Sequence, residues 1–182
     1  KKIDNYIALD KLRLHEPKEI ELLWRARFAN QETALCAVIQ GDTYKTLYRN
    51  ARHHPMFVLP LFRPGQGVEM QFCQWTFPDG ETAHLILTSL LEYKTRGEYA
   101  RPHTIIEHHA ELLEEKGLVL MKGDLTDSRA LNGLQATWML TLLQRFYCVD
   151  VDSTDQGSQR RRSMLQDFTA GKAFDVDALI EE

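Results

Sequence analysis

Histidine and glutamate side chains gather in one short stretch of the chain, at His103, Glu107, His108, His109 and Glu111. Imidazole and carboxylate groups are common zinc ligands, and a zinc-bound water is a hydrolytic nucleophile. His108-x-x-Glu111 begins an inverted zincin motif, but that motif requires histidine at position 112, where this chain has leucine. The pattern favours structural histidines. A small metal-dependent hydrolase that uses His103, His108, His109 and Glu111 remains the alternative.

Other catalytic motifs are incomplete. Gly65-x-Gly67 begins a dinucleotide-binding fingerprint, but Met70 stands where the third glycine belongs. Cys36, Cys73 and Cys148 are widely spaced in apolar sequence, which indicates small core groups in a reducing compartment. We therefore expect no catalytic residue, no metal, no cofactor and no enzymatic activity.

The composition is that of an ordinary globular domain, with 182 residues, 43% of them hydrophobic and 26% charged. A formal net charge of −4 makes the chain a poor candidate for nucleic-acid binding. No apolar run approaches the ~18 residues of a membrane span, so we expect no membrane insertion. The sequence starts at Lys1 without an apolar targeting region, and we expect any targeting peptide to lie upstream.

Hydrophobic periodicity predicts the elements of the first half. We expect an extended segment over residues 1–16 and then a helix from Pro17 whose apolar stripe includes Trp24 and Phe28. Residues 35–39 read as a strand, followed by a helix that ends before Pro55.

The middle of the chain predicts antiparallel strands. We expect strands over residues 56–62, 68–73 and 82–93, the last two joined by the turn at Pro78-Asp79-Gly80.

In the second half, Thr104-Ile-Ile-Glu107 matches a capping box and predicts a helix that Gly117 ends. A central strand over residues 118–125 and a helix over residues 130–146 follow. The stripe predicted to face the core on that helix is Leu131, Leu134, Trp138, Leu142 and Phe146. Residues 150–162 are predicted to form a mobile loop and residues 174–180 a last short helix.

These elements predict a single α+β domain over residues 1–182. Its sheet is expected to be mainly antiparallel, with a mixed sheet as the alternative, and to have about five to six strands flanked by helices.

The segment from His54 to Phe62 carries two prolines within a hydrophobic run. Proline has no N–H to donate to a strand ladder, so such a strand belongs at a sheet edge or a bulge. An apolar edge requires a cover. Either a helix of the same domain supplies this cover or a partner chain does. The same two alternatives apply to Trp75 and Phe77 at the end of the hairpin.

Four segments of this chain occur in the order of a known family. They are His54-Pro-Met-Phe-Val-Leu-Pro-Leu61, Gln74-Trp75, Thr95-Arg96-Gly97-Glu98 and Glu114-Glu115-Lys116-Gly117-Leu118-Val119-Leu120-Met121. Together they resemble the mitochondrial ATP synthase F-one sector assembly factor family, the chaperones of the ATP synthase beta subunit. The resemblance spans about residues 33–182.

The resemblance implies a non-enzymatic chaperone of the mitochondrial matrix. Such a protein binds the free beta subunit transiently and masks its apolar interface against aggregation. It then releases the subunit to the alpha subunit without ATP hydrolysis, and we expect it to be monomeric when free.

The proposed contact surface combines the proline-marked edge with aromatic side chains at the hairpin end. A charged pair beside Gly97 is expected either to orient the loop between strand and helix or to pair with the partner. These candidates are Met56, Phe57, Leu59, Leu61, Trp75, Phe77, Arg96 and Glu98.

Overall fold

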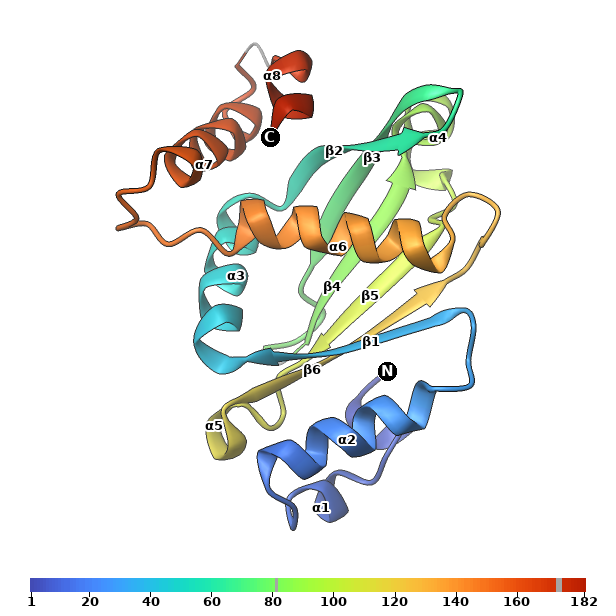
Figure 1. The fold of residues 1–182 in the computed structure, drawn as a ribbon, viewed down its shortest axis with the longest axis vertical. Coiled ribbons are helices and arrows are strands. Elements are labelled where there is room, and N and C mark those ends of the chain that lie inside the picture. The colour runs from blue at the N-terminus through green and yellow to red at the C-terminus, as the bar shows by residue number, and fades with distance from the viewer. Residues whose placement is uncertain (81, 173–174) are drawn as a thin grey trace.

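A six-stranded antiparallel sheet forms the centre of the molecule (Figure 1). The computed structural model describes residues 1–80, 82–172 and 175–182. The sheet has the order β1-β6-β5-β4-β3-β2, so β1 and β2 are its edges. Every neighbouring pair is antiparallel, which confirms the α+β class and removes the mixed sheet from consideration. The strands are β1 (Ala34–Gln40), β2 (Met56–Arg63), β3 (Gly67–Thr76), β4 (Thr82–Ser89), β5 (Thr104–His109) and β6 (Leu118–Leu125).

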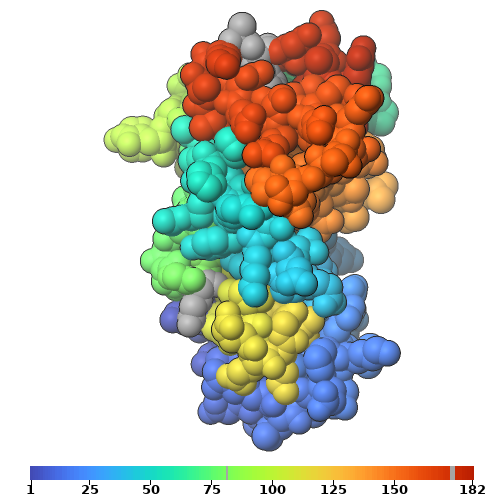
Figure 2. Space-filling view, turned by 90° about the vertical axis from the view of Figure 1, so that its left-hand side faces the viewer, coloured from blue at the N-terminus to red at the C-terminus, as the bar shows by residue number. Residues whose placement is uncertain are grey.

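Helices cover both faces of this sheet. They are α1 (Leu9–Leu12), α2 (Pro17–Phe28), α3 (Gly41–His53), α4 (Leu90–Arg96), α5 (Leu113–Lys116), α6 (Gly133–Tyr147), α7 (Gln156–Thr169) and α8 (Val176–Glu181). The N-terminal helices lie at one end of the long axis, and α7 and α8 lie at the other (Figures 1 and 2). Among the described residues, no helix has both the length and the apolar character to cross a bilayer.

Alternation along the strands assigns each side chain to one of two faces. The face under α6, called the front face here, includes the directly paired residues Phe57, Cys73 and Leu87. The opposite face, called the back face, includes the directly paired row of Met56, Gln74, Ile86, Ile105 and Asp124.

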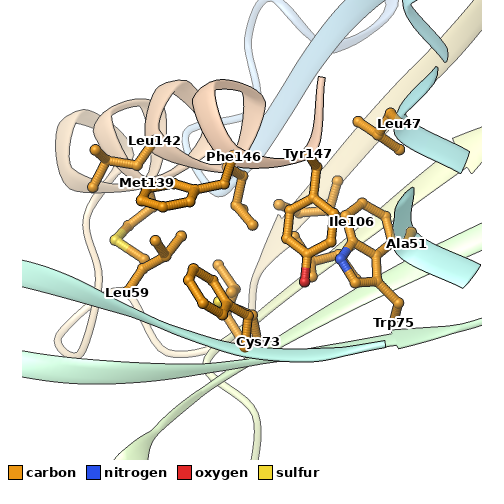
Figure 3. Close-up of a cluster of buried hydrophobic side chains, with 14 of the residues drawn as sticks. Leu47, Ala51, Leu59, Cys73, Trp75, Ile106, Met139, Leu142, Phe146 and Tyr147 are labelled. Carbon is orange, nitrogen blue, oxygen red and sulfur yellow. The ribbon is translucent and has the colours of Figure 1, made fainter. Parts of the chain in front are cut away.

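The main core lies between the front face and helices α3, α6 and α7. Side chains of α6 point toward the strands and meet Leu59, Cys73 and Trp75 (Figure 3). Phe57 is fully buried, and its ring centroid lies 5.2 Å from that of Phe146 and 5.5 Å from that of Phe168. Burial of large aromatic side chains supplies much of the driving force for folding here.

A second core lies on the back face, under α1 and α2. Ile20, Trp24 and Phe28 of α2 are buried against Leu118 and Leu120 of β6, as the predicted stripe of α2 requires. The indole N–H of Trp24 donates a hydrogen bond to the Met121 carbonyl oxygen at 2.9 Å, which satisfies its polar atom inside the core.

The first 16 residues are folded rather than extended. A 3₁₀ turn (Ile3–Asn5) and α1 place Ile3 and Leu12 in the second core, where both are fully buried. The Ile3 backbone N–H donates to a Glu111 carboxylate oxygen at 3.0 Å, and the Tyr6 hydroxyl donates to Glu107 at 3.1 Å. Apolar burial and buried carboxylates therefore order this segment together.

His109 joins those two carboxylates. Its Nε2 lies 2.8 Å from Glu107 Oε2 and its Nδ1 lies 3.6 Å from Glu111 Oε1, with the histidine side chain fully buried. Burial opposes the charged imidazole, but the two carboxylates outweigh it and raise the pKa of His109. Burial likewise opposes each carboxylate, yet the pKa of Glu107 is lowered by its hydrogen bond from His109, and the pKa of Glu111 is lowered by the nearby imidazole. The cluster is a buried ion pair that holds the N-terminal segment.

Two predicted elements in the middle of the chain were wrong in type or length. Residues 104–109 form strand β5, so the predicted helix there is wrong; only α5 remains of it, and Gly117 ends that turn with φ of 66°. The strand predicted over residues 82–93 stops at Ser89, whose hydroxyl caps α4 by accepting from the Glu92 N–H.

The C-terminal region is also more helical than predicted. Helix α7 starts at Gln156, inside the segment 150–162 that was predicted to be a mobile loop, and the Asp155 carboxylate caps it. The last predicted helix exists as α8, while Phe174 lies outside the described residues.

The stripe predicted for α6 was partly wrong. Leu142 and Phe146 are buried as expected, together with Met139. Leu134 and Trp138 are not, because they remain 83% and 43% exposed. Helix α6 therefore turns a different face to the sheet from the one its leucine and tryptophan spacing predicted.

The buried His109 cluster predicts a pH optimum for stability. A raised histidine pKa stabilises the fold below the ordinary value of 6.5 and loses this effect as pH rises through the folded value. The lowered glutamate pKa values stabilise it above the ordinary 4.5 and lose this effect as pH falls through the folded values. The cluster should therefore contribute most between pH 4.5 and 6.5.

The test compares His109→Gln with the parent protein by urea unfolding across this range. We expect the variant to lose about 1.5–3 kcal/mol near pH 5.5 and less at pH 8. Comparing the two proteins at each pH cancels the opposite contribution of His103 and His108, whose pKa burial lowers to about 4. A stability difference independent of pH would contradict an ionised His109.

Phe57 predicts a large loss of stability on truncation. We expect Phe57→Ala to lower the free energy of unfolding by about 3–5 kcal/mol, since it opens a cavity among aromatic rings. Met56→Ala, next to it but 48% exposed, is the matched control and should cost far less. Equal losses for the two variants in urea unfolding would contradict the assignment of Phe57 to the core.

Candidate partner-binding surface

Strand β2 is a sheet edge, as its prolines predicted. The Trp75 N–H donates to the Pro55 carbonyl oxygen at 2.7 Å, so alternation turns the N–H and C=O groups of odd-numbered β2 residues toward β3. Even-numbered residues turn theirs outward, and Pro60 is one of them. Pro60 has no N–H to offer at that position, so an added strand would lack a ladder bond there.

Four of the eight predicted contact residues are core residues. Phe57 and Leu59 are fully buried, Leu61 is 1% exposed and Trp75 is 5% exposed. Their side chains point to the front face, where α6 and α7 cover them. The expectation that these side chains form an open apolar edge is thereby corrected: helices of the same chain supply their cover.

The other four remain accessible but do not form one surface. Met56 lies on the back face near one end of β3, whereas Phe77 packs on α3, with its ring centroid 5.3 Å from that of Tyr48. Arg96 and Glu98 are exposed beyond the other end of β3, where Arg96 Nε lies 3.4 Å from Glu92 Oε1. Their contact with a partner stays a prediction.

Gly97, between those two charged residues, has φ of 58°. Residues other than glycine rarely adopt this conformation, so Gly97 supplies the backbone freedom that this turn requires.

Helix α6 presents an apolar pair that the sequence analysis assigned to the core. Leu134 and Trp138 are one turn apart, so their side chains are neighbours on the outer side of the helix. We call them the α6 outer pair. Figure 1 shows α6 crossing in front of the sheet.

The composition of α6 carried a signal for this pair. Buried positions include Ala136, Met139, Leu143 and Tyr147, which together with Leu142 and Phe146 already fill one side of the helix. A helix that covers a sheet with one side cannot bury a second apolar side. The buried side of α6 is already filled, so Leu134 and Trp138 remain on its exposed side.

The histidines predicted as possible metal ligands are separated by the sheet. His108 points to the front face, where its ring centroid lies 5.5 Å from that of Trp75, and His109 points to the back face. His103 Nε2 lies 2.7 Å from the Gln71 amide oxygen, in a third environment. Across residues 1–80, 82–172 and 175–182, no three His, Cys, Asp or Glu side chains are placed to hold a metal ion. The hydrolase alternative has no support from this geometry.

The chain matches known proteins along nearly its whole length. The family model described as "ATP11 protein" matches residues 1–180. The protein atp11, mitochondrial, of Schizosaccharomyces pombe is 38% identical over 174 residues, which are 96% of this chain and 59% of that protein. The ATP synthase mitochondrial F1 complex assembly factor 1 of Homo sapiens is 32% identical over 154 residues, 85% of this chain and 44% of that protein.

These relatives are longer proteins, so the chain spans about half of their length. The match nevertheless includes both cores, the β2 edge and helix α6. The resemblance inferred from the four sequence segments is confirmed, and the chain belongs to the ATP11 protein family.

Proposed function

We propose that this protein is a chaperone for assembly of the F1 sector of mitochondrial ATP synthase. The observation that carries the proposal is family membership over residues 1–180, together with human and mouse relatives named as F1 complex assembly factors. The same names place those relatives in mitochondria, and we assign this protein to the matrix, where a chaperone could meet a free F1 subunit.

The client in this proposal is the free beta subunit. The protein masks an apolar interface of that subunit and yields it to the alpha subunit as the sector assembles. Release then follows from competition, because the native neighbour binds the same interface more tightly than the chaperone does. Such a mechanism needs no ATP hydrolysis by the chaperone.

The α6 outer pair is the contact we propose for the client. Leucine and tryptophan side chains that remain exposed on a folded domain are typical of protein interfaces, and tryptophan is enriched among the residues that dominate binding energy. Trp138 is 43% exposed on a helix that the core holds from its other side, so the contact is presented on a rigid support. Met56, Phe77, Arg96 and Glu98 stay secondary candidates.

The client assignment predicts specific protection in a refolding assay. Isolated beta subunit is diluted from denaturant with an equimolar amount of this protein and without nucleotide, and light scattering is followed. We expect less aggregation and a complex that elutes as one peak in gel filtration, which adding alpha subunit then dissolves.

The alpha subunit and an unrelated aggregating enzyme serve as clients in parallel controls. Equal protection of all three would contradict a beta-specific chaperone, and protection of alpha alone would reassign the client. Unchanged aggregation of beta would contradict the proposed function itself.

The contact assignment predicts a separation of binding from stability. Leu134→Ala combined with Trp138→Ala should weaken beta-subunit binding about tenfold or more, since both side chains would be buried in the complex. The unfolding midpoint should fall much less than it does with Phe57→Ala, since Leu134 is 83% exposed and Trp138 43% exposed whereas Phe57 is fully buried. Affinity is measured by titrating labelled beta subunit at a fixed temperature.

Leu91→Ala combined with Tyr99→Ala is the matched control. Leu91 and Tyr99 are 74% and 80% exposed in the α4 region, which contacts the back face, so the same kinds of side chain are removed elsewhere. Met56→Ala, run alongside, tests the sequence-based assignment. A loss with the control or with Met56→Ala, but not with the α6 variant, would move the contact to the back face.

A further inference from the structure

A cavity of about 840 Å³ opens at one end of the sheet, where β4 and β6 end and β3 and β5 begin. Its wall is formed by α4, by the segment before β5 and by the loop after β6. This volume falls in the range of ordinary ligand pockets, about 300–1,000 Å³. It is distinct from the α6 outer pair, because neither Leu134 nor Trp138 lines it.

Arginine dominates the lining of this cavity. Arg63, Arg96, Arg101 and Arg129 all line it, against the carboxylates of Glu69, Glu92 and Asp127. The lining therefore has an excess of one formal positive charge, whereas the whole chain carries −4. We call this site the arginine pocket.

One arginine of the arginine pocket is unpaired. The Arg101 side chain is exposed, and its guanidinium has no hydrogen-bond or ion-pair partner among the residues the structure describes. Only its backbone N–H is engaged, as a donor to Glu92 Oε1 at 3.4 Å. A guanidinium offers five donors suited to a planar carboxylate, so Arg101 is free to bind one from outside.

Two more arginines at the rim hold weak internal partners. Arg96 Nε lies 3.4 Å from Glu92 Oε1, and Arg129 Nε lies 3.5 Å from Asp127 Oδ1. The Arg129 side chain is 92% exposed and the Arg96 side chain 55% exposed. Exposed pairs of this kind contribute little to stability, so an incoming carboxylate can replace the internal one at small cost.

The floor of the pocket is fixed. Arg63 donates from two nitrogens to the two oxygens of Glu69 at 3.0 and 3.3 Å, and it also bonds the Ala130 carbonyl oxygen. Glu69 accepts in addition from the Gln71 amide at 2.8 Å, and Gln71 in turn reaches His103. Burial lowers the pKa of His103 to about 4, so this histidine is neutral near pH 7 and adds no charge to the pocket.

We propose that the arginine pocket binds an acidic peptide segment of a partner protein, with carboxylates seated on Arg96, Arg101 and Arg129. A peptide fits better than a nucleotide because none of the described residues that line the cavity is a Phe, Tyr or Trp on which a base could stack. The spread of the donors over three separate segments also suits several carboxylates along a chain. This site is additional to the client contact on α6.

The test uses a fluorescein-labelled oligoglutamate peptide and fluorescence anisotropy, at about 0.05 M and 0.3 M NaCl. We expect saturable binding at low salt that weakens at high salt. Arg96→Ala combined with Arg101→Ala should weaken it about tenfold, since each arginine supplies a charge-assisted contact. Unlabelled inorganic phosphate and ATP are added as competitors.

The control is Arg25→Ala combined with Lys45→Ala, which removes two positive charges from exposed sites on α2 and α3 outside the pocket. All variants are first checked for an unchanged thermal unfolding midpoint. Retained binding by the control, with loss in the pocket variant, supports the site. Equal loss in both variants, or no binding by the parent protein, overturns it. Competition by millimolar phosphate or ATP at constant ionic strength would also overturn it in favour of a phosphate site. None of these outcomes depends on the beta-subunit assay.

Discussion

The structure depends on a strict register of six antiparallel strands whose two faces have different chemistry. On β5, His108 points to the front face and is buried near Trp75, neutral because burial lowers its pKa to about 4. The next residue, His109, points to the back face and is paired with two carboxylates that raise its pKa. A shift of β5 by one residue would exchange these two environments. It would carry the ionised pair of Glu107 and His109 into the aromatic core and away from Tyr6, so the environments of both faces fix the register.

Local sequence patterns predicted an element correctly where the burial of one of its faces determines which positions are apolar. The stripe of α2 is explained by its packing against the back face at β1 and β6, and Pro60 marked the edge strand because proline fits only an outward position there. Residues 104–107 show the opposite case. Their capping-box pattern is equally compatible with a strand that alternates Thr104 and Ile106 with Ile105 and Glu107. Pairing with β4 on one side and β6 on the other selects the strand, and no short window contains that information.

The contact surface was harder to predict for a related reason. Apolar residues in β2 indicate that something covers them, but they do not indicate whether the cover comes from the same chain. Here α6 and α7 supply the cover, so Phe57, Leu59 and Leu61 belong to the core. The exposed apolar side chains lie instead on the outer side of α6. Leu134 and Trp138 were misassigned because their spacing fits a helical stripe as well as the buried set does. Only the number of apolar residues on α6, larger than one side can hold, distinguishes the two sides.

The small size of the α6 outer pair fits the proposed release of a client without an energy source. Burying a large apolar side chain contributes about 1.5–3 kcal/mol, and Trp138 is already more than half buried in the free protein. Two such residues fall short of the roughly 8 kcal/mol that a micromolar complex requires. The remainder has to come from polar contacts around them, which are individually weaker and more easily exchanged. In the proposed mechanism, a client held in this way is protected while its interface is free and is displaced when a larger native surface competes for it. A low affinity that permits exchange is then compatible with specificity for one client. The rigid helix holds Leu134 and Trp138 in a fixed geometry, which selects a complementary partner without binding it tightly.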